Sequence, residues 1–65
     1  MFVIRHVKTV EGVDKMMYFK RFGKFQVDWV EDPKDAKQYK EERQTAKDIS
    51  TLRMASKGDY YTVQL

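Results

Sequence analysis

Cysteine is absent from this sequence of 65 residues, and proline and histidine occur once each, as Pro33 and His6. Without cysteine the chain has no disulfide framework and no thiolate metal site, so it must fold by packing alone or against a partner. The three glycines, Gly12, Gly23 and Gly58, are isolated from one another. This spacing excludes a glycine-rich phosphate-binding loop.

Long apolar runs are also missing. No segment approaches the ~20 apolar residues that a membrane-spanning helix needs. Residues 1–8 lack the apolar stretch and the cleavage site of a secretory signal. We therefore expect a cytoplasmic protein that makes no contact with a membrane.

The residues that are present favour a small folded domain. Apolar residues make up 42% of the chain and aromatic residues 14%, which is too much for a disordered tail. The chain is too short for the usual enzyme scaffolds, and a domain of this size buries only about 60% of its unfolded surface. We predict one domain, residues 1–65, with a small core.

Two β-favouring runs, residues 16–22 and 25–30, surround Gly23 and Lys24. Glycine at the first central position of a two-residue turn is typical of a type II′ β-hairpin, and such a turn sets the strand register. In that register Tyr18 lies opposite Trp29. The face predicted to enter the core carries Met16, Tyr18, Lys20, Phe22, Phe25, Val27 and Trp29.

Two further strands are predicted at the ends of the chain. Residues 2–8 are rich in β-branched side chains, and residues 60–65 alternate in character. In the last strand we expect Tyr61, Val63 and Leu65 to face the core.

The segment between the hairpin and the last strand is helical in pattern. Asp32 and Pro33 are typical of a helix start, and apolar residues then recur at helical spacing with a gap around Glu42. The pattern fits one helix from Pro33 to about Met54, or a short turn at 33–39 followed by a helix from about Glu41. The order β-β-β-α-β predicts an α+β fold, in which one helix packs on one face of a mostly antiparallel sheet of three to four strands.

Residues 18–52 combine the Gly-Lys hairpin with an Asp32-Pro33-x-x-Ala36-x-x-Tyr39 entry and an Ala46-x-x-Ile49-x-x-Leu52 helix. This combination resembles small uncharacterised phage and prophage proteins of Gram-positive bacteria. The resemblance implies a hairpin-and-helix fold and a phage-type origin. It also implies a role in inhibiting or redirecting a host protein, in the host cytoplasm, and it supplies no catalytic residues.

Catalytic and metal-binding patterns are not found. His6 has no nucleophile or acid at a recognisable spacing, and Asp32 and Asp35 are explained as helix-start residues. We therefore predict a protein that is not an enzyme, with no cofactor, no metal and no small-molecule substrate.

A single covering helix leaves the other face of the sheet open, and this face is the predicted contact surface. In the predicted register it carries Met17, Phe19, Arg21 and Val30, a mixture of apolar and arginine side chains that is typical of protein interfaces. We expect the partner to be another protein or a second copy of the chain.

The alternative hypothesis is nucleic-acid binding by the basic aromatic hairpin, residues 15–27. Residues 1–27 hold six basic residues and two acids, Glu11 and Asp14, so this part carries a net charge of +4, whereas the whole chain carries +3. Basic side chains neutralise phosphates and exposed rings stack on bases. The residues predicted for this role are Lys20, Arg21, Phe22 and Lys24.

Overall fold

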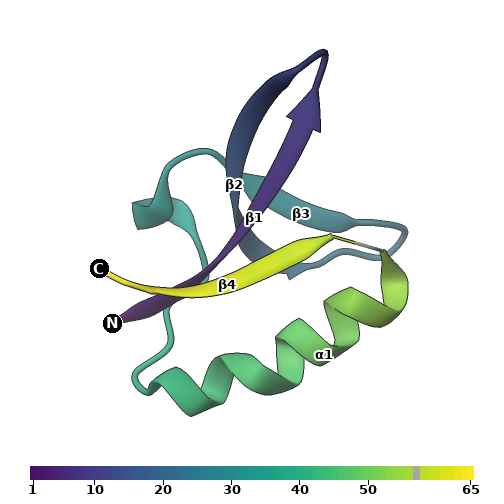
Figure 1. The fold of residues 1–65 in the computed structure, drawn as a ribbon. Helices are drawn as coiled ribbons and strands as arrows, with labels where there is room; N and C mark the ends of the chain where they lie inside the picture. The colour runs from purple at the N-terminus through teal and green to yellow at the C-terminus, as the bar shows by residue number, and fades with distance from the viewer. Residues whose placement is uncertain (57) are drawn as a thin grey trace.

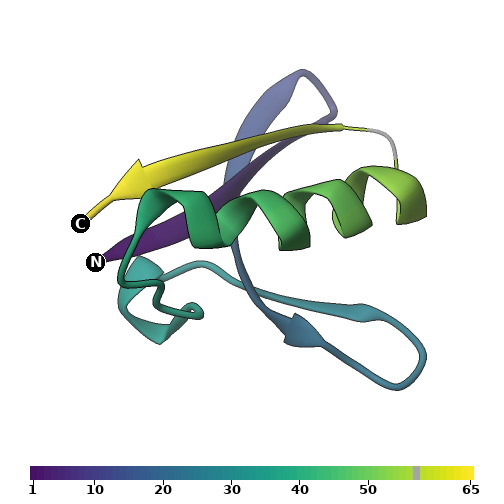
Figure 2. The same cartoon turned by 90° about the horizontal axis from the view of Figure 1, so that it is seen from below.

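The computed structural model describes residues 1–56 and 58–65 and contains a four-stranded antiparallel sheet covered by one helix (Figure 1). The strands are β1 (Phe2–Val10), β2 (Val13–Phe22), β3 (Val27–Val30) and β4 (Asp59–Gln64), in the spatial order β3-β2-β1-β4. The helix α1 (Thr45–Ala55) lies against one side of the sheet, as the view from below also shows (Figure 2). The predicted α+β fold is confirmed.

The first two strands form a long hairpin whose tip projects beyond the rest of the molecule (Figure 1). Val10 pairs with Val13, so the turn consists of Glu11 and Gly12, whose φ angles are 53° and 78°. Positive φ at both central residues defines a type I′ turn, whose twist matches that of the flanking strands. The strands therefore extend further into this turn than the sequence predicted.

The β2–β3 connection differs from the predicted two-residue turn. Phe22 pairs with Val27, which leaves residues 23–26 as the loop, and the Gly23 N–H donates to the Gln26 carbonyl at 2.8 Å. The register changes between Phe19 and Arg21, so one extra residue is accommodated in β2. This β-bulge allows Phe19 and Phe22, three positions apart, to share one face, which strict alternation forbids.

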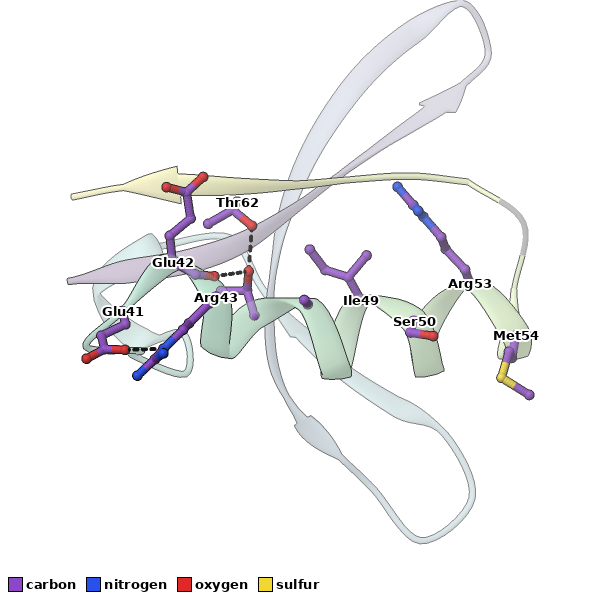
Figure 3. A pocket seen from close by; sticks show the side chains of 10 residues that line it. Glu41, Glu42, Arg43, Ile49, Ser50, Arg53, Met54 and Thr62 are labelled. Carbon is purple, nitrogen blue, oxygen red and sulfur yellow. Dashed lines mark hydrogen bonds and ion pairs between the residues drawn. The ribbon is translucent and has the colours of Figure 1, made fainter.

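The helical region follows the second of the two predicted arrangements. A 3₁₀ turn η1 (Pro33–Asp35) is capped by Asp32, whose side chain accepts from the Lys34 N–H at 2.9 Å. A second 3₁₀ turn η2 (Glu42–Gln44) leads directly into α1. The hydroxyls of Thr45 and Thr62, 2.6 Å apart, join the start of α1 to β4 (Figure 3).

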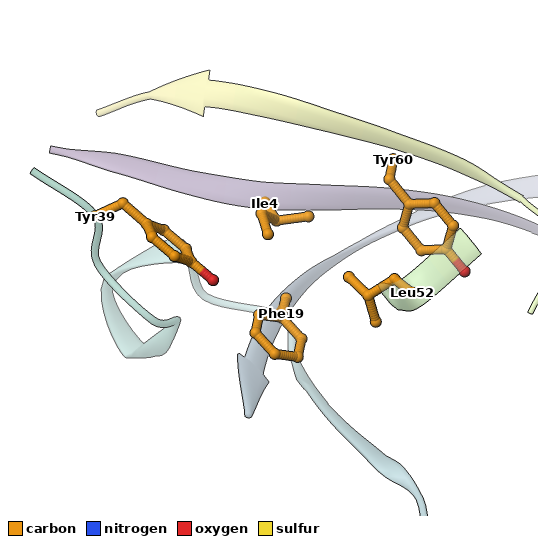
Figure 4. Packing of buried hydrophobic residues seen from close by; sticks show 5 residues of the cluster. All are labelled: Ile4, Phe19, Tyr39, Leu52 and Tyr60. Carbon is orange, nitrogen blue, oxygen red and sulfur yellow. The ribbon is translucent and has the colours of Figure 1, made fainter. Parts of the chain in front are cut away.

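The main core lies between the sheet and α1. It consists of Ile4, Phe19, Tyr39, Leu52 and Tyr60, which are drawn in Figure 4. Phe2, Val27, Trp29 and Ile49 pack around this cluster. Val3 and Ala36 are also buried but lie outside it.

The core faces predicted for β2 and β4 were inverted. Phe19 and Tyr60 are buried, whereas Met16 is 55% and Tyr61 46% exposed. The side-chain period of a strand is two, so a one-residue error in register moves every residue to the other face. Val27 and Trp29 of β3 do pack against the core, as predicted.

Candidate binding surfaces

The residues predicted for the protein interface do not lie on one surface. Phe19 has no solvent exposure and is a central core residue, so its placement on the open face was wrong. Met17 pairs with His6, on the same face as Ile4 and Phe19, and is half-buried on the helix side. Arg21 and Val30 lie on the face away from α1, opposite Asp28 and Tyr18 respectively.

The residues predicted for nucleic-acid binding are all exposed, but three of the four already have neighbours. Arg21 donates from Nε to Asp28 at 2.8 Å, and the Phe22 ring packs on Phe19 with ring centroids 4.8 Å apart. Lys24 places its ammonium over the ring of Phe25, 5.4 Å from the centroid. Lys20 lies at the bulge. Arg21 therefore contributes little net positive charge to this surface.

The face of the sheet away from α1, here called the open face, is apolar over much of its area. Strand pairing places Arg5 at its centre, directly opposite Tyr18 on one side and Tyr61 on the other. Several of its apolar side chains are exposed or partly exposed to solvent: Val7, Met16, Tyr18, Val30, Tyr61 and Val63. Sequence reasoning identified the existence of this face but, apart from Arg21 and Val30, assigned the wrong residues to it.

Arg5 is the unusual residue of the open face. Its guanidinium carbon lies 5.9 Å from the centre of the Tyr61 ring, which is a cation–π distance. Its Nε is buried and donates to no hydrogen-bond acceptor within the described residues. A buried donor without an acceptor is costly. Arg5 as a whole is partly exposed, so an incoming carbonyl or carboxylate oxygen would approach the outer part of its guanidinium rather than the enclosed Nε.

The open face is not electropositive. Arg5 and Arg21 share it with three acids that the strand pairing places on the same side, Asp14, Asp28 and Asp59. Two of these acids are occupied, since Asp28 binds Arg21 and Asp14 accepts from Thr9 at 2.6 Å. Such a balance disfavours phosphate binding on this face, because phosphate contacts require a net positive charge.

A cleft of about 880 Å³ lies on the other side of the sheet, between the projecting hairpin, the 25–27 segment and the end of α1. The rings of His6, Trp29 and Tyr60 meet here, with His6 4.7 Å from Tyr60 and 5.1 Å from Trp29. The charged residues in its lining are Lys8, Lys15 and Glu31. Gly58 closes one wall so tightly that a Cβ there would lie 2.5 Å from the His6 ring.

His6 is held as part of this wall. Its Nδ1 lies 3.0 Å from the carbonyl oxygen of Asp59. A carbonyl only accepts, so Nδ1 carries the proton and Nε2 is the nitrogen left for other contacts. This role was not visible in the sequence, because His6 and Tyr60 become neighbours only when β1 pairs with β4.

A buried ionisable pair joins α1 to the segment before it. The Tyr39 hydroxyl donates to Asp48, and Lys37 donates to the same carboxylate at 3.1 Å. Burial, and then the hydrogen bond to Asp48, raise the pKa of Tyr39 far above its ordinary value. Burial acts to raise the pKa of Asp48, but the hydrogen bonds from Tyr39 and Lys37 outweigh it, so that pKa is lowered. The pair therefore links α1, through Asp48, to Tyr39, which is a core residue.

A groove of about 910 Å³ runs between α1 and β4 (Figure 3). Its middle is formed by Ala46, Ile49, Ser50 and Thr62, and its ends carry charged residues. Glu42 points toward β4 at one end and Arg53 at the other, as Figure 3 shows. Arg43 pairs with Glu41, whereas Glu42 and Arg53 take part in no ion pair among the described residues.

Comparisons of the chain with protein families, with curated proteins and with solved structures found no match. The resemblance to phage proteins therefore stays a prediction. In the part of the chain that the structure describes, no helix is long and apolar enough to cross a membrane. Nor do three potential metal ligands of the His, Asp or Glu type come together among those residues.

Proposed function

We propose that this protein is a non-enzymatic binding module that acts by contact with another protein through the open face of its sheet. The observation that carries the proposal is Arg5, an arginine that makes no ion pair among the described residues and lies at the centre of an apolar surface. Aromatic residues, methionine and arginine are the side chains enriched in protein interfaces. Tyr18, Tyr61 and Met16 surround Arg5 on this face.

The charge balance supports a protein partner rather than nucleic acid for the open face, because the acids there offset the arginines. A partner backbone carbonyl or carboxylate accepts a hydrogen bond from the outer part of the Arg5 guanidinium, and the surrounding apolar side chains exclude water from that bond. More specifically, we propose a phage-type modulator of a host factor, in which a host protein supplies the carbonyl or carboxylate that binds Arg5. The resemblance of residues 18–52 is what supports this more specific proposal.

Substitution of Met16 tests the proposal. Met16 is 55% exposed on the open face, and Val13, on the same strand but on the opposite face, is 59% exposed. Met16→Lys and Val13→Lys are therefore matched in chemistry and exposure. Tagged wild-type protein and both variants are used to capture proteins from a Gram-positive lysate, and binding of each to the purified captured protein is then measured.

The proposal expects the captured protein to bind wild type and Val13→Lys with equal affinity, and Met16→Lys at least about tenfold more weakly, because burying an unpaired charge at an interface is costly. Equal binding by all three proteins contradicts the proposal. So does the absence of any saturable partner.

Nucleic-acid binding is a second candidate, favoured by the cleft rather than by the residues that the sequence singled out. The cleft combines Lys8 and Lys15 with the rings of His6, Trp29 and Tyr60, and the exposed Phe25 is part of its lining. Phosphates of a single strand would pair with the lysines while a base packs on the rings.

The only tryptophan of the chain, Trp29, reports directly on this second candidate. Titration with a single-stranded oligonucleotide of mixed sequence should quench Trp29 fluorescence at low salt and lose the effect at high salt. Lys8→Ala with Lys15→Ala should weaken binding, whereas Lys20→Ala with Lys24→Ala should not. The reverse pattern would assign binding to the outer surface of the hairpin, and no quenching at low salt would reject the cleft.

A further inference from the structure

We infer that a second copy of this chain pairs with it along β4, so that two sheets join edge to edge and the two α1–β4 grooves meet. The inference belongs to the same class as the proposed function, protein contact. It concerns another surface, however, so the two proposals are tested by different variants.

The first argument is that β4 is an unprotected sheet edge. The spatial order β3-β2-β1-β4 leaves β3 and β4 with one unpaired side each. In natural proteins, edge strands are usually kept from pairing with other chains because they are short or contain bulges, proline or inward-pointing charges. β3 has one of these protections, since it is only four residues long.

β4 has none of them within its last five residues. It pairs with β1 over six consecutive residues with no register shift. Residues 60–64 contain no lysine, arginine, proline or glycine, and Tyr61 is 46% exposed. A regular, uncharged edge of this kind presents free backbone N–H and C=O groups for a further strand.

The second argument is the charge pattern of the groove beside β4. Glu42 lies at one end and Arg53 at the other, both pointing toward β4, and the middle is apolar or small (Figure 3). A two-fold axis perpendicular to the sheet pairs β4 antiparallel with its copy and keeps both helices on the same side. The same axis reverses the groove, so Glu42 of one copy meets Arg53 of the other, twice per dimer. Self-complementary surfaces are what two-fold dimers require.

The strand register that fits this reversal is centred on Tyr61. The midpoint between Glu42 and Arg53 lies between two and three residues beyond Thr45, which is roughly 4 Å along the helix at about 1.5 Å per residue. Thr45 is bonded to Thr62, and α1 runs antiparallel to β4. A shift of roughly 4 Å from Thr62 reaches about one residue along β4, near Tyr61, since a strand rises about 3.3 Å per residue. Tyr60 then lies opposite the partner's Thr62, on the helix side in both copies.

The experiment measures the association of the purified 65-residue chain by sedimentation velocity over a wide range of concentration. Wild type is expected to shift from monomer to dimer as concentration rises. Glu42→Arg and Arg53→Glu should each weaken the dimer by roughly tenfold or more, because each places like charges together at both ends of the interface. The double variant, Glu42→Arg with Arg53→Glu, should recover the wild-type association.

The matched control is Lys47→Glu, a charge reversal on the exposed side of the same helix but outside the groove. It should leave association unchanged, and circular dichroism of every variant establishes that the fold is retained. A wild type that stays monomeric at all concentrations overturns the inference. A dimer whose association is unchanged by Glu42→Arg and by Arg53→Glu also overturns it. So does a double variant that does not recover the wild-type association.

The open-face variant separates this inference from the proposed function. Met16→Lys should leave self-association intact, because Met16 lies on β2, away from the β4 edge. If Met16→Lys disrupts the dimer and the charge reversals do not, the second copy occupies the open face and the β4 inference is wrong.

Discussion

Phe19 and Tyr18 illustrate how much a single strand position decides in this molecule. Both are aromatic neighbours on β2, but Phe19 is fully buried under α1 and Tyr18 lies on the open face beside Arg5. Composition does not separate them, since either ring fits a core. Adjacent strand residues face opposite sides, and the bulge after Phe19 places Phe19, rather than Tyr18, on the same side as Phe22.

Phe19→Ala should destabilise the protein by about 3–5 kcal/mol, because it leaves a cavity at the centre of the core. In a domain this small, such a loss is comparable to the whole free energy of unfolding. The measurement is urea unfolding followed by Trp29 fluorescence.

Phe25→Ala is the matched control, since Phe25 is 91% exposed in the β2–β3 loop. It should change the free energy of unfolding by less than about 0.5 kcal/mol. A Phe19→Ala variant as stable as Phe25→Ala would show that the predicted two-residue turn, with Phe19 in solvent, was the right register after all.

The Tyr39–Asp48 pair predicts how stability depends on pH. The pKa of Asp48 is lower in the folded chain than its ordinary value of 3.8, so its contribution is present above that pH and is lost as pH falls through the folded value. The pKa of Tyr39 is raised above 10.0, so its contribution is present below that pH and is lost progressively as pH rises further.

Asp48→Asn should therefore flatten the fall in stability at acid pH, and Tyr39→Phe should flatten the fall above pH 10.0. Thermal melts across the pH range provide the measurement, with Asp35→Asn as a control at an exposed carboxylate in η1. Identical pH profiles for wild type and Asp48→Asn would exclude the pair as the source of the acid effect.

At the scale of elements, the turns of the two hairpins differ from what the sequence predicts. The Gly23-Lys24 pair looked like a tight turn, but the strands separate there into a loop of residues 23–26. The tight turn is instead Glu11-Gly12, where the first residue is a glutamate at a φ of 53°. Glutamate is uncommon in this left-handed region, so propensity alone pointed to the wrong place.

Glu11→Asn should stabilise the protein by about 0.5–1 kcal/mol, because Asn-Gly is the preferred pair in a type I′ turn and asparagine tolerates positive φ. Chemical unfolding of the variant measures the gain. Glu31→Asn, which removes a glutamate from an exposed residue outside this turn, is the control for the loss of charge. A loss of stability in Glu11→Asn would argue against the type I′ geometry.

At the scale of the whole molecule, the ends of the chain are neighbours. The Leu65 N–H donates to the Met1 carbonyl at 2.9 Å, and Figure 1 shows the N- and C-termini side by side. β1 therefore lies between β2, its nearest neighbour in sequence, and β4, the most distant. The pairing of β1 with β4 completes the sheet and buries Tyr60.

Joining the termini through a short glycine linker should raise the free energy of unfolding by about 2–4 kcal/mol, because a closed chain has fewer unfolded conformations to lose. The linear chain carrying the same linker at its C-terminus is the control, and chemical unfolding is the measurement. Equal stability of the circular and linear chains would indicate that the termini are not held together in solution.

The sequence by itself determined the element order, the α+β class and the capping role of Asp32, which caps a 3₁₀ turn rather than a long helix. It also offered, as one of two arrangements, the observed turn followed by a later helix. These features depend on local spacing and capping, which short stretches of sequence encode. Only the tertiary structure decided which faces of β2 and β4 are buried, and therefore that Tyr18 and Tyr61, rather than Phe19, lie on the open face. That choice depends on a β-bulge and on a pairing between the two ends of the chain. No local pattern records either, because both depend on which strand pairs with which, between residues far apart in the sequence.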